Sequence, residues 1–249
     1  MELSLSFFIF VFLILFLSFF VKGLAGFGDP LISNPLLALF LENKLISPAN
    51  LCFSTPVNAY LSWKNRHAFC IKSTLPMALC ILCGVIPGAM LLKYGSSWFL
   101  KALLGLLILA IGLEMITRKQ AKPIHPNRII MAVVCFCSGI TAGLYGINLF
   151  FVAYVERVAK GREEFRGNIC FIFLIENLFR FIVYFFSGVI TREVLLLTLI
   201  ALPGMAAGLW AGSMVDKKVS DTAIRCLTIA VFMLSGASVL IKAFFDIPW

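Results

Sequence analysis

Charged side chains are scarce in this sequence of 249 residues. Only 13% are Asp, Glu, Lys or Arg and 61% are hydrophobic, whereas a soluble domain has about 25% charged and about 45–50% apolar residues. A single globule of this size cannot bury that much apolar surface. The composition therefore excludes a soluble enzyme, a disordered chain and a disulfide-linked secreted domain, and it favours an integral membrane protein.

Acidic residues are scarcer still, with 12 Asp and Glu against 21 Lys and Arg. The basic residues occur in short clusters between apolar runs, as in cytoplasmic loops of membrane proteins. The net charge of +9 therefore does not indicate nucleic-acid binding. The eight Cys lie mostly within apolar runs, where Cys packs as a small hydrophobic residue. We expect no metal site and no cofactor.

Apolar runs divide the chain into ten segments. Two short segments, at 28–41 and 146–159, are interrupted by Gly or follow Gly-rich stretches. The other eight are substantial, near the roughly 20 residues that span a bilayer. They are about 3–22, 45–63, 70–94, 98–117, 129–142, 165–187, 192–214 and 222–245. The sequence thus predicts an all-α polytopic membrane protein with eight long transmembrane helices and two short broken helices.

Short motifs of the first half recur in the second half at an offset of 117 to 120 residues. The matched pairs are Asn50 with Asn168, Gly84 with Gly204, Gly88 with Gly208, and Gly26 with Gly143. Three motifs in the same order at nearly one offset indicate a duplicated unit. We therefore expect an N-terminal repeat at 1–120 and a C-terminal repeat at 121–249.

The distribution of basic residues favours two inverted repeats. If both short segments cross the membrane, Lys and Arg outside the spans divide fifteen to five between the two sides; if neither crosses, they divide nine to eleven. The positive-inside rule favours the first case, with the loop Arg118–Arg128 in the cytoplasm and both termini outside. Five segments per repeat is an odd number, so the repeats would be inverted. Inverted repeats with interrupted segments at matching places are typical of secondary transporters.

Two Gly-rich turns are candidate anion sites. The first runs from Gly23 to Pro35 and the second from Gly139 to Asn148. Backbone N–H groups and a following helix N-terminus suit an anion, and a tight interfacial turn explains the first stretch equally well. The candidate residues are Gly26, Gly28, Gly143 and Asn148.

A first polar stripe comprises Asn50, Ser54 and Asn58, which are four residues apart and share one helix face. Polar stripes on membrane helices face other helices or water rather than lipid. Both a substrate-binding face and a hydrogen-bonded helix contact fit this pattern.

A second stripe comprises Asn168, Glu176 and Arg180. An Arg in mid-span costs at least about 2.5–3.5 kcal/mol on insertion scales, so such residues usually have a function. Arg180 is the candidate for binding an anion, with Glu176 holding it and taking part in proton coupling. The alternative is a self-contained ion pair that joins helices.

At these motifs the chain resembles the sulfite exporter (TauE/SafE-type) permease family. The resemblance spans nearly the whole chain and rests on motifs in a fixed order: Gly23-Leu-Ala-Gly26-Phe-Gly28, Pro35-Leu-Leu, Gly84-x-x-x-Gly88, and Arg166-Gly-Asn168 after a Gly-rich turn. It implies a multi-pass permease for sulfite, organosulfonates or related small anions. Asp29 and Asn148 depart from the Gly-rich pattern of the family, and a carboxylate near an anion site is unfavourable unless it is protonated or paired.

The function expected from these observations is secondary transport, not enzymatic catalysis. The substrate would be a small sulfur-containing or carboxylate anion, and protons would be the coupling ion. The protein would be surrounded by lipid in the plasma membrane (the bacterial inner membrane). Two alternatives stay open: a membrane-embedded thiol oxidoreductase using Cys80 and Cys83, and a passive anion channel.

Overall fold

The computed structural model describes residues 5–25, 27–64, 66–67, 71–117, 127–158, 162–215 and 221–245. In these ranges it contains ten α-helices and no β-strand. The helices are α1 (Leu5–Ala25), α2 (Asp29–Ala38), α3 (Asn43–Lys64), α4 (Ile71–Tyr94), α5 (Ser97–Thr117), α6 (Arg128–Tyr145), α7 (Leu149–Val158), α8 (Arg162–Phe186), α9 (Arg192–Val215) and α10 (Asp221–Phe245). The expectation of an all-helical protein is confirmed.

Six helices in the described part of the chain are long and apolar enough to cross a membrane. The spans lie at Ser6–Leu24, Thr74–Tyr94, Ser97–Glu114, Arg128–Tyr145, Gly167–Phe186 and Arg192–Val215. The chain is therefore a multi-pass membrane protein. Helices α3 and α10 have 22 and 25 residues but are not among the six, so the number of eight long transmembrane helices stays a prediction.

Helix α6 ends later than the sequence suggests. The Gly content of the stretch predicted an end near residue 142, whereas the helix continues to Tyr145 and ends at Gly146, whose φ of 72° is left-handed. Gly139 and Gly143 do not break the helix because they pack against α4. The interruption between α6 and α7 is therefore only three residues long.

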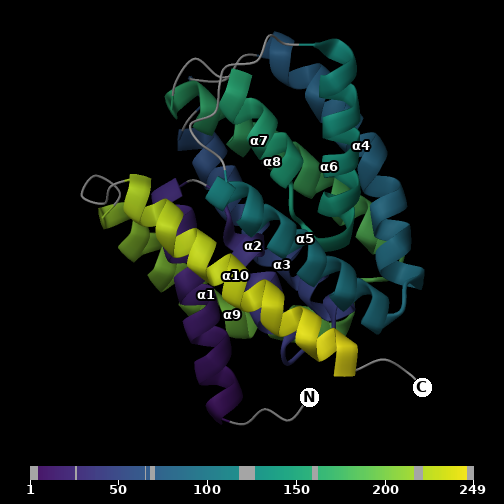
Figure 1. Ribbon diagram of the computed structural model, residues 1–249, viewed down its shortest axis with the longest axis vertical. Helices are drawn as coiled ribbons and strands as arrows, with labels where there is room; N and C mark the ends of the chain where they lie inside the picture. Colours follow the sequence, from purple (N-terminus) through teal and green to yellow (C-terminus); the bar gives the residue numbers. More distant parts are fainter. Residues whose placement is uncertain are drawn as a thin grey trace. The chain divides into compact units, whose positions relative to one another are not determined.

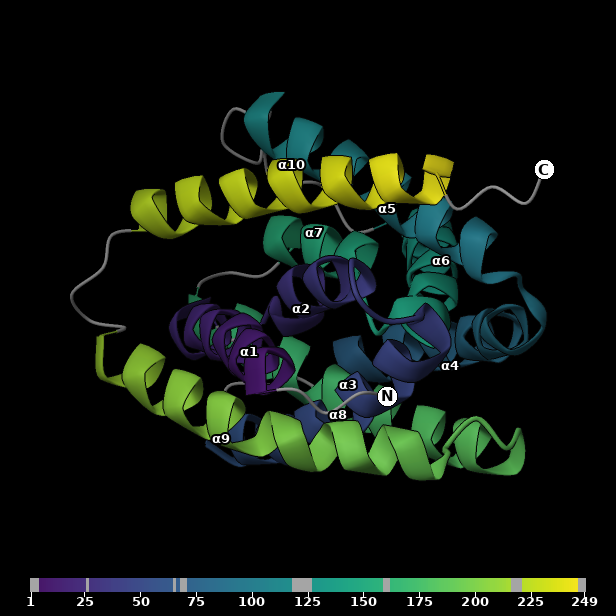
Figure 2. The same cartoon turned by 90° about the horizontal axis from the view of Figure 1, so that it is seen from below.

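The described residues form two compact units, and each unit draws on both halves of the sequence. The first comprises α1, α2, α3 up to Phe53, α5, α9 and α10. Within it α1 packs along α9 and α5 along α10 (Figure 1 and Figure 2). A Cβ on Gly208 of α9 would lie only 2.3 Å from the carbonyl oxygen of Phe16 on α1, so the two backbones touch.

The second unit comprises α3 from Ser54, α4, α6, α7 and α8. Its closest helix pair is α4 with α6. A Cβ on Gly139 would lie 2.1 Å from the carbonyl oxygen of Ile81, and Gly84 and Gly88 meet the α6 backbone in the same way. Small residues that bring helix backbones together are typical of membrane proteins, and this packing requires the repeated Gly motifs.

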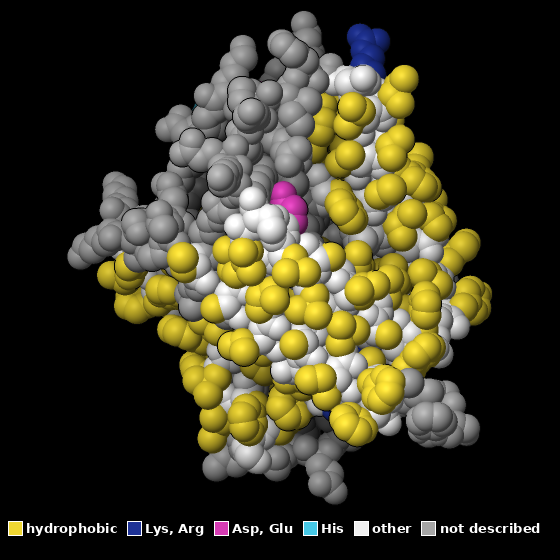
Figure 3. Space-filling model, in the orientation of Figure 1, with side chains coloured by type: hydrophobic (Ala, Val, Ile, Leu, Met, Phe, Trp, Pro, Cys, Tyr) yellow, Lys and Arg dark blue, Asp and Glu magenta, His cyan; other side chains and the backbone are white. Residues whose placement is uncertain are grey.

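The surface of the described residues is strongly apolar. Large exposed side chains include Met90, Leu106, Phe186, Leu199 and Trp210. Figure 3 shows hydrophobic side chains over most of the described face and very few charged ones. Such a surface suits the hydrocarbon region of a bilayer.

Candidate functional site

Two backbone polar groups at the interruption between α6 and α7 form hydrogen bonds with side chains of α6. Thr141 donates its hydroxyl to the carbonyl of Ile147 at 2.7 Å. The backbone N–H of Phe151 donates to the hydroxyl oxygen of Ser138 at 3.2 Å. Irregular backbone at membrane depth is tolerated only where such partners exist. The interruption is thus a defined structure that places Asn148 opposite α8.

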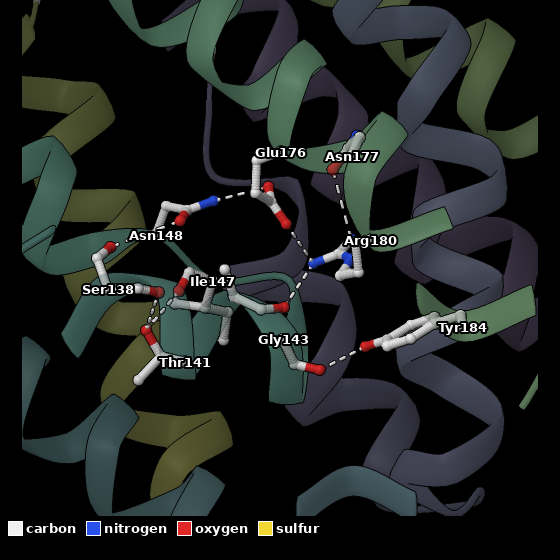
Figure 4. A network of polar contacts seen from close by, with 10 residues as sticks. Ser138, Thr141, Gly143, Ile147, Asn148, Glu176, Asn177, Arg180 and Tyr184 are labelled. Carbon is white, nitrogen blue, oxygen red and sulfur yellow. Dashed lines mark hydrogen bonds and ion pairs between the residues drawn. The ribbon is translucent and has the colours of Figure 1, made fainter. Parts of the chain in front are cut away.

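Arg180 of α8 points at the C-terminal end of α6 (Figure 4). Its Nη1 donates to the carbonyl oxygen of Ala142 at 2.6 Å and lies 3.2 Å from Oε1 of Glu176. Asn148 donates its Nδ2 to Oε2 of Glu176 at 3.0 Å. Arg180 is 1% exposed and Glu176 2%. The structure therefore brings three of the predicted site residues into one buried network.

Gly146 and Tyr184 hold the guanidinium of Arg180 in place. A Cβ on Gly146 would lie 2.8 Å from Nη1 of Arg180, so the guanidinium packs against this bare backbone. The ring of Tyr184 lies 5.7 Å from the Cζ of Arg180, a cation–π distance. The Tyr184 hydroxyl donates to the carbonyl of Gly143 at 2.6 Å.

Polar atoms of this network are left without hydrogen bonds. Among the described residues, Nε of Arg180, Nδ2 of Asn177 and Oε1 of Glu176 are buried and have no hydrogen-bond partner. The 3.2 Å contact of Oε1 with Arg180 is thus an ion pair without hydrogen-bond geometry. Buried polar groups are nearly always hydrogen-bonded, so this network has the capacity to bind a polar ligand.

A second buried polar cluster lies in the first unit. Nζ of Lys22 is 2.8 Å from Oδ1 of Asp29. Asn50 donates to Oγ of Ser33 at 3.0 Å and to Oδ1 of Asn34 at 2.8 Å. The carboxylate of Asp29, which departs from the family pattern, is therefore paired. Lys22 is 1% exposed, although the count of loop charges treated it as a surface residue.

Apart from Gly143, which joins the Arg180 network through the Tyr184 hydroxyl, the remaining predicted site residues that the structure describes have other places in the fold. Asn168 accepts a hydrogen bond from Thr74 at 3.1 Å, and Ser54 and Asn58 are buried on α3. Gly28 precedes α2 with a left-handed φ of 102°. Gly143 lies inside α6 rather than in a turn, so it contributes a carbonyl to Tyr184 instead of a free N–H. Gly26 lies outside the described residues.

Sequence reasoning did not find every residue of the two clusters. It missed Ser138 and Thr141, whose hydroxyls form hydrogen bonds with the backbone at the interruption between α6 and α7. It also missed the pairing of Lys22 with Asp29. A usable signal existed for that pair, because opposite charges stand directly before and after Gly23–Gly28, the Gly-rich start of the first turn. Among the described residues, no three His, Cys, Asp or Glu side chains form a group suited to a metal ion.

A comparison with protein families matches residues 11–239 to the family described as sulfite exporter TauE/SafE. The match covers nearly the whole chain and includes both Gly-rich turns and all predicted site residues. No curated protein and no solved structure matches the chain.

Proposed function

The chain belongs to the sulfite exporter TauE/SafE family, and from this membership we propose that it is a secondary transporter for a small sulfur-containing anion. Sulfite and organosulfonates are the preferred substrates, and related carboxylates are the next. Protons serve as coupling ion, through Glu176. The protein acts as a permease rather than as an enzyme, in the plasma membrane, which is the inner membrane in a bacterium.

The observation that carries this proposal is the buried guanidinium of Arg180. It lies in a membrane-spanning helix, is 1% exposed and retains an unpaired Nε. A guanidinium binds oxyanions through two parallel N–H donors, which a lysine cannot do. Ionisable residues within membrane helices commonly mark substrate or ion pathways.

We further propose ten crossings in two inverted repeats. Support comes from the helix pairs that pack through Gly. The first helix of the first repeat, α1, packs on α9, and the first helix of the second repeat, α6, packs on α4. Helices α4 and α9 carry the matched motifs at Gly84 and Gly204. The first helix of each repeat therefore packs on the fourth helix of the other repeat.

A thermal-shift screen of the purified protein tests the substrate assignment. A ligand that binds only the folded state raises the apparent melting temperature. We expect sulfite or an organosulfonate such as taurine to give the largest shift, above sulfate, thiosulfate and simple carboxylates. Chloride at the same ionic strength is the control. Equal shifts for all these anions, chloride included, would contradict a specific anion site.

The thiol oxidoreductase alternative gains no support from the family. Cys80 and Cys83 are free thiols on α4, and their i, i+3 spacing puts them on one face of a helix. Replacing all eight Cys by Ala or Ser should leave anion binding unchanged. Saturable flux that follows an ion gradient separates a carrier from a passive channel.

A further inference from the structure

One turn of α8 carries three buried atoms that lack hydrogen bonds. They are Oε1 of Glu176, Nδ2 of Asn177 and Nε of Arg180. The three side chains are 1% to 3% exposed and are linked through the guanidinium, since Nη1 of Arg180 contacts Glu176 at 3.2 Å and Nη2 lies 3.5 Å from Oδ1 of Asn177. Figure 4 shows Glu176 beside Asn148 and Arg180 beside the end of α6, with Asn177 joined to Arg180 by a dashed line.

The two edges of the guanidinium are used differently. Nη1 is anchored by the carbonyl of Ala142 and by Glu176. The other edge, formed by Nε and Nη2, has an unpaired Nε and one long contact from Nη2. This edge is the one that presents two parallel N–H groups to an oxyanion. The unpaired amide nitrogen of Asn177 belongs to the residue next to that edge and adds a further donor.

Glu176 restricts which anions fit beside these donors. Oε1 of Glu176 accepts hydrogen bonds, but it would repel an unprotonated oxygen of the bound anion. Among the described residues, the charged group that pairs with Glu176 is Arg180 on the same helix, and the neutral Asn148 faces it from the interruption before α7. Among the side chains that the structure describes on α4 and α7, which pack against α8, none forms an ion pair with Glu176 or Arg180. A proton between Oε1 and the ligand removes the repulsion and satisfies the acceptor.

We propose that this turn of α8 binds an oxyanion together with one proton. Oxygens of the ligand accept from Nε of Arg180 and Nδ2 of Asn177, and the proton lies between another ligand oxygen and Oε1 of Glu176. The substrate class is therefore an anion with at least three oxygens on one centre, and Glu176 takes up the proton as the anion binds. Because Asn177 donates to one of the ligand oxygens, it helps to determine which anions bind. This inference rests on the proposed function and specifies its site.

Calorimetry on the wild-type protein tests the proton. Sulfite is titrated at a pH at which free sulfite is the dianion, in buffers with different ionisation enthalpies, so that the protons taken up per ligand can be counted. We expect one proton per sulfite, and affinity that falls about tenfold per pH unit in this range, as linkage requires for one bound proton. Binding without proton uptake would overturn the inference.

Two variants locate the proton and the donor. Glu176→Gln should bind sulfite without proton uptake, because the amide cannot take the proton. Asn177→Ala should raise the sulfite Kd about 10- to 100-fold, the usual effect of losing a hydrogen bond to a charged group. Leu178→Ala is the matched control, since Leu178 is the next residue of α8 and is 52% exposed; its Kd should equal that of the wild type.

The outcomes separate this inference from the proposed function. Unchanged proton uptake in Glu176→Gln, or an unchanged Kd in Asn177→Ala, would overturn the inference while sulfite binding by the wild type still supported the transporter. Absence of sulfite binding by the wild type would contradict the sulfite assignment and the inference together.

Discussion

At the scale of single residues, the buried charges of Lys22 and Asp29 form an ion pair between two helix ends. Lys22 lies in the last turn of α1 and Asp29 in the first turn of α2. Each therefore sits at the helix end whose dipole favours its charge. Their 2.8 Å contact joins the end of α1 to the start of α2 and explains how a carboxylate is tolerated there.

The Lys22–Asp29 pair should stabilise the fold only as a pair. Lys22→Met or Asp29→Leu alone leaves a buried charge unpaired, at a cost of about 3–5 kcal/mol. The double variant removes both charges and should be clearly more stable than either single variant. Unfolding of all four proteins in one detergent measures this coupling. Additive losses in the double variant would show that the two side chains do not interact.

Residue types could be predicted from the sequence, but many of their partners could not. Arg180 and Glu176 stand four residues apart on one helix, so their contact follows from helical spacing. Asn168 and Thr74 are 94 residues apart and share a hydrogen bond. Long-range pairs of this kind depend on how α4 and α8 pack, which no local pattern encodes.

At the scale of helices, the Gly residues determine where helices end and where they touch. The extent of each apolar run predicted the ten helices that the described ranges contain, because charged residues are costly within a membrane span. The end of α6 was harder to predict. Gly143 and Gly146 look equivalent in sequence, but one packs against α4 within the helix and the other ends the helix with a positive φ.

Gly146→Ala should damage both the helix end and the site. A non-Gly residue in the left-handed region costs about 1–2 kcal/mol, and the new Cβ would also displace the guanidinium of Arg180, which lies 2.8 Å away. Gly188→Ala is the matched control, because Gly188 has a φ of 68° and no neighbour within 4 Å.

Both variants should lose similar backbone stability, but only Gly146→Ala should also lose anion affinity. Thermal stability and anion Kd are measured for both proteins. Equal affinity in the two variants would argue that the position of Arg180 does not depend on Gly146.

At the scale of the whole molecule, the inverted topology remains the main prediction from the sequence. The charge asymmetry puts the loop before α6 in the cytoplasm and the connection between α4 and α5 outside. Length and composition alone assign six spans in the described ranges: the short helices α2 and α7 fall below the usual length, and the long helices α3 and α10 are also not among the six. Helices α2 and α7 have 10 residues each, fewer than a regular spanning helix has, so the ten crossings proposed above include two broken ones that use irregular backbone beside α2 and α7.

Cysteine labelling tests the topology. In a variant without native Cys, Asn127→Cys marks the start of α6 and Ser96→Cys the connection between α4 and α5; both positions are exposed. An impermeant maleimide should label position 96 in intact cells and position 127 only after the cells are permeabilised. Ready labelling of position 127 in intact cells would contradict the proposed orientation.

The most direct test of the central claim is anion flux into proteoliposomes that contain the wild type, Arg180→Lys or Arg180→Gln. Arg192→Gln, a change at an exposed Arg, is the control. We predict saturable sulfite flux for the wild type and the control. Arg180→Lys should give reduced flux, because the charge remains but the two-donor geometry is lost, and a folded Arg180→Gln should give background flux. Wild-type flux and affinity in Arg180→Gln would contradict the account and leave Arg180 as the structural partner of Glu176.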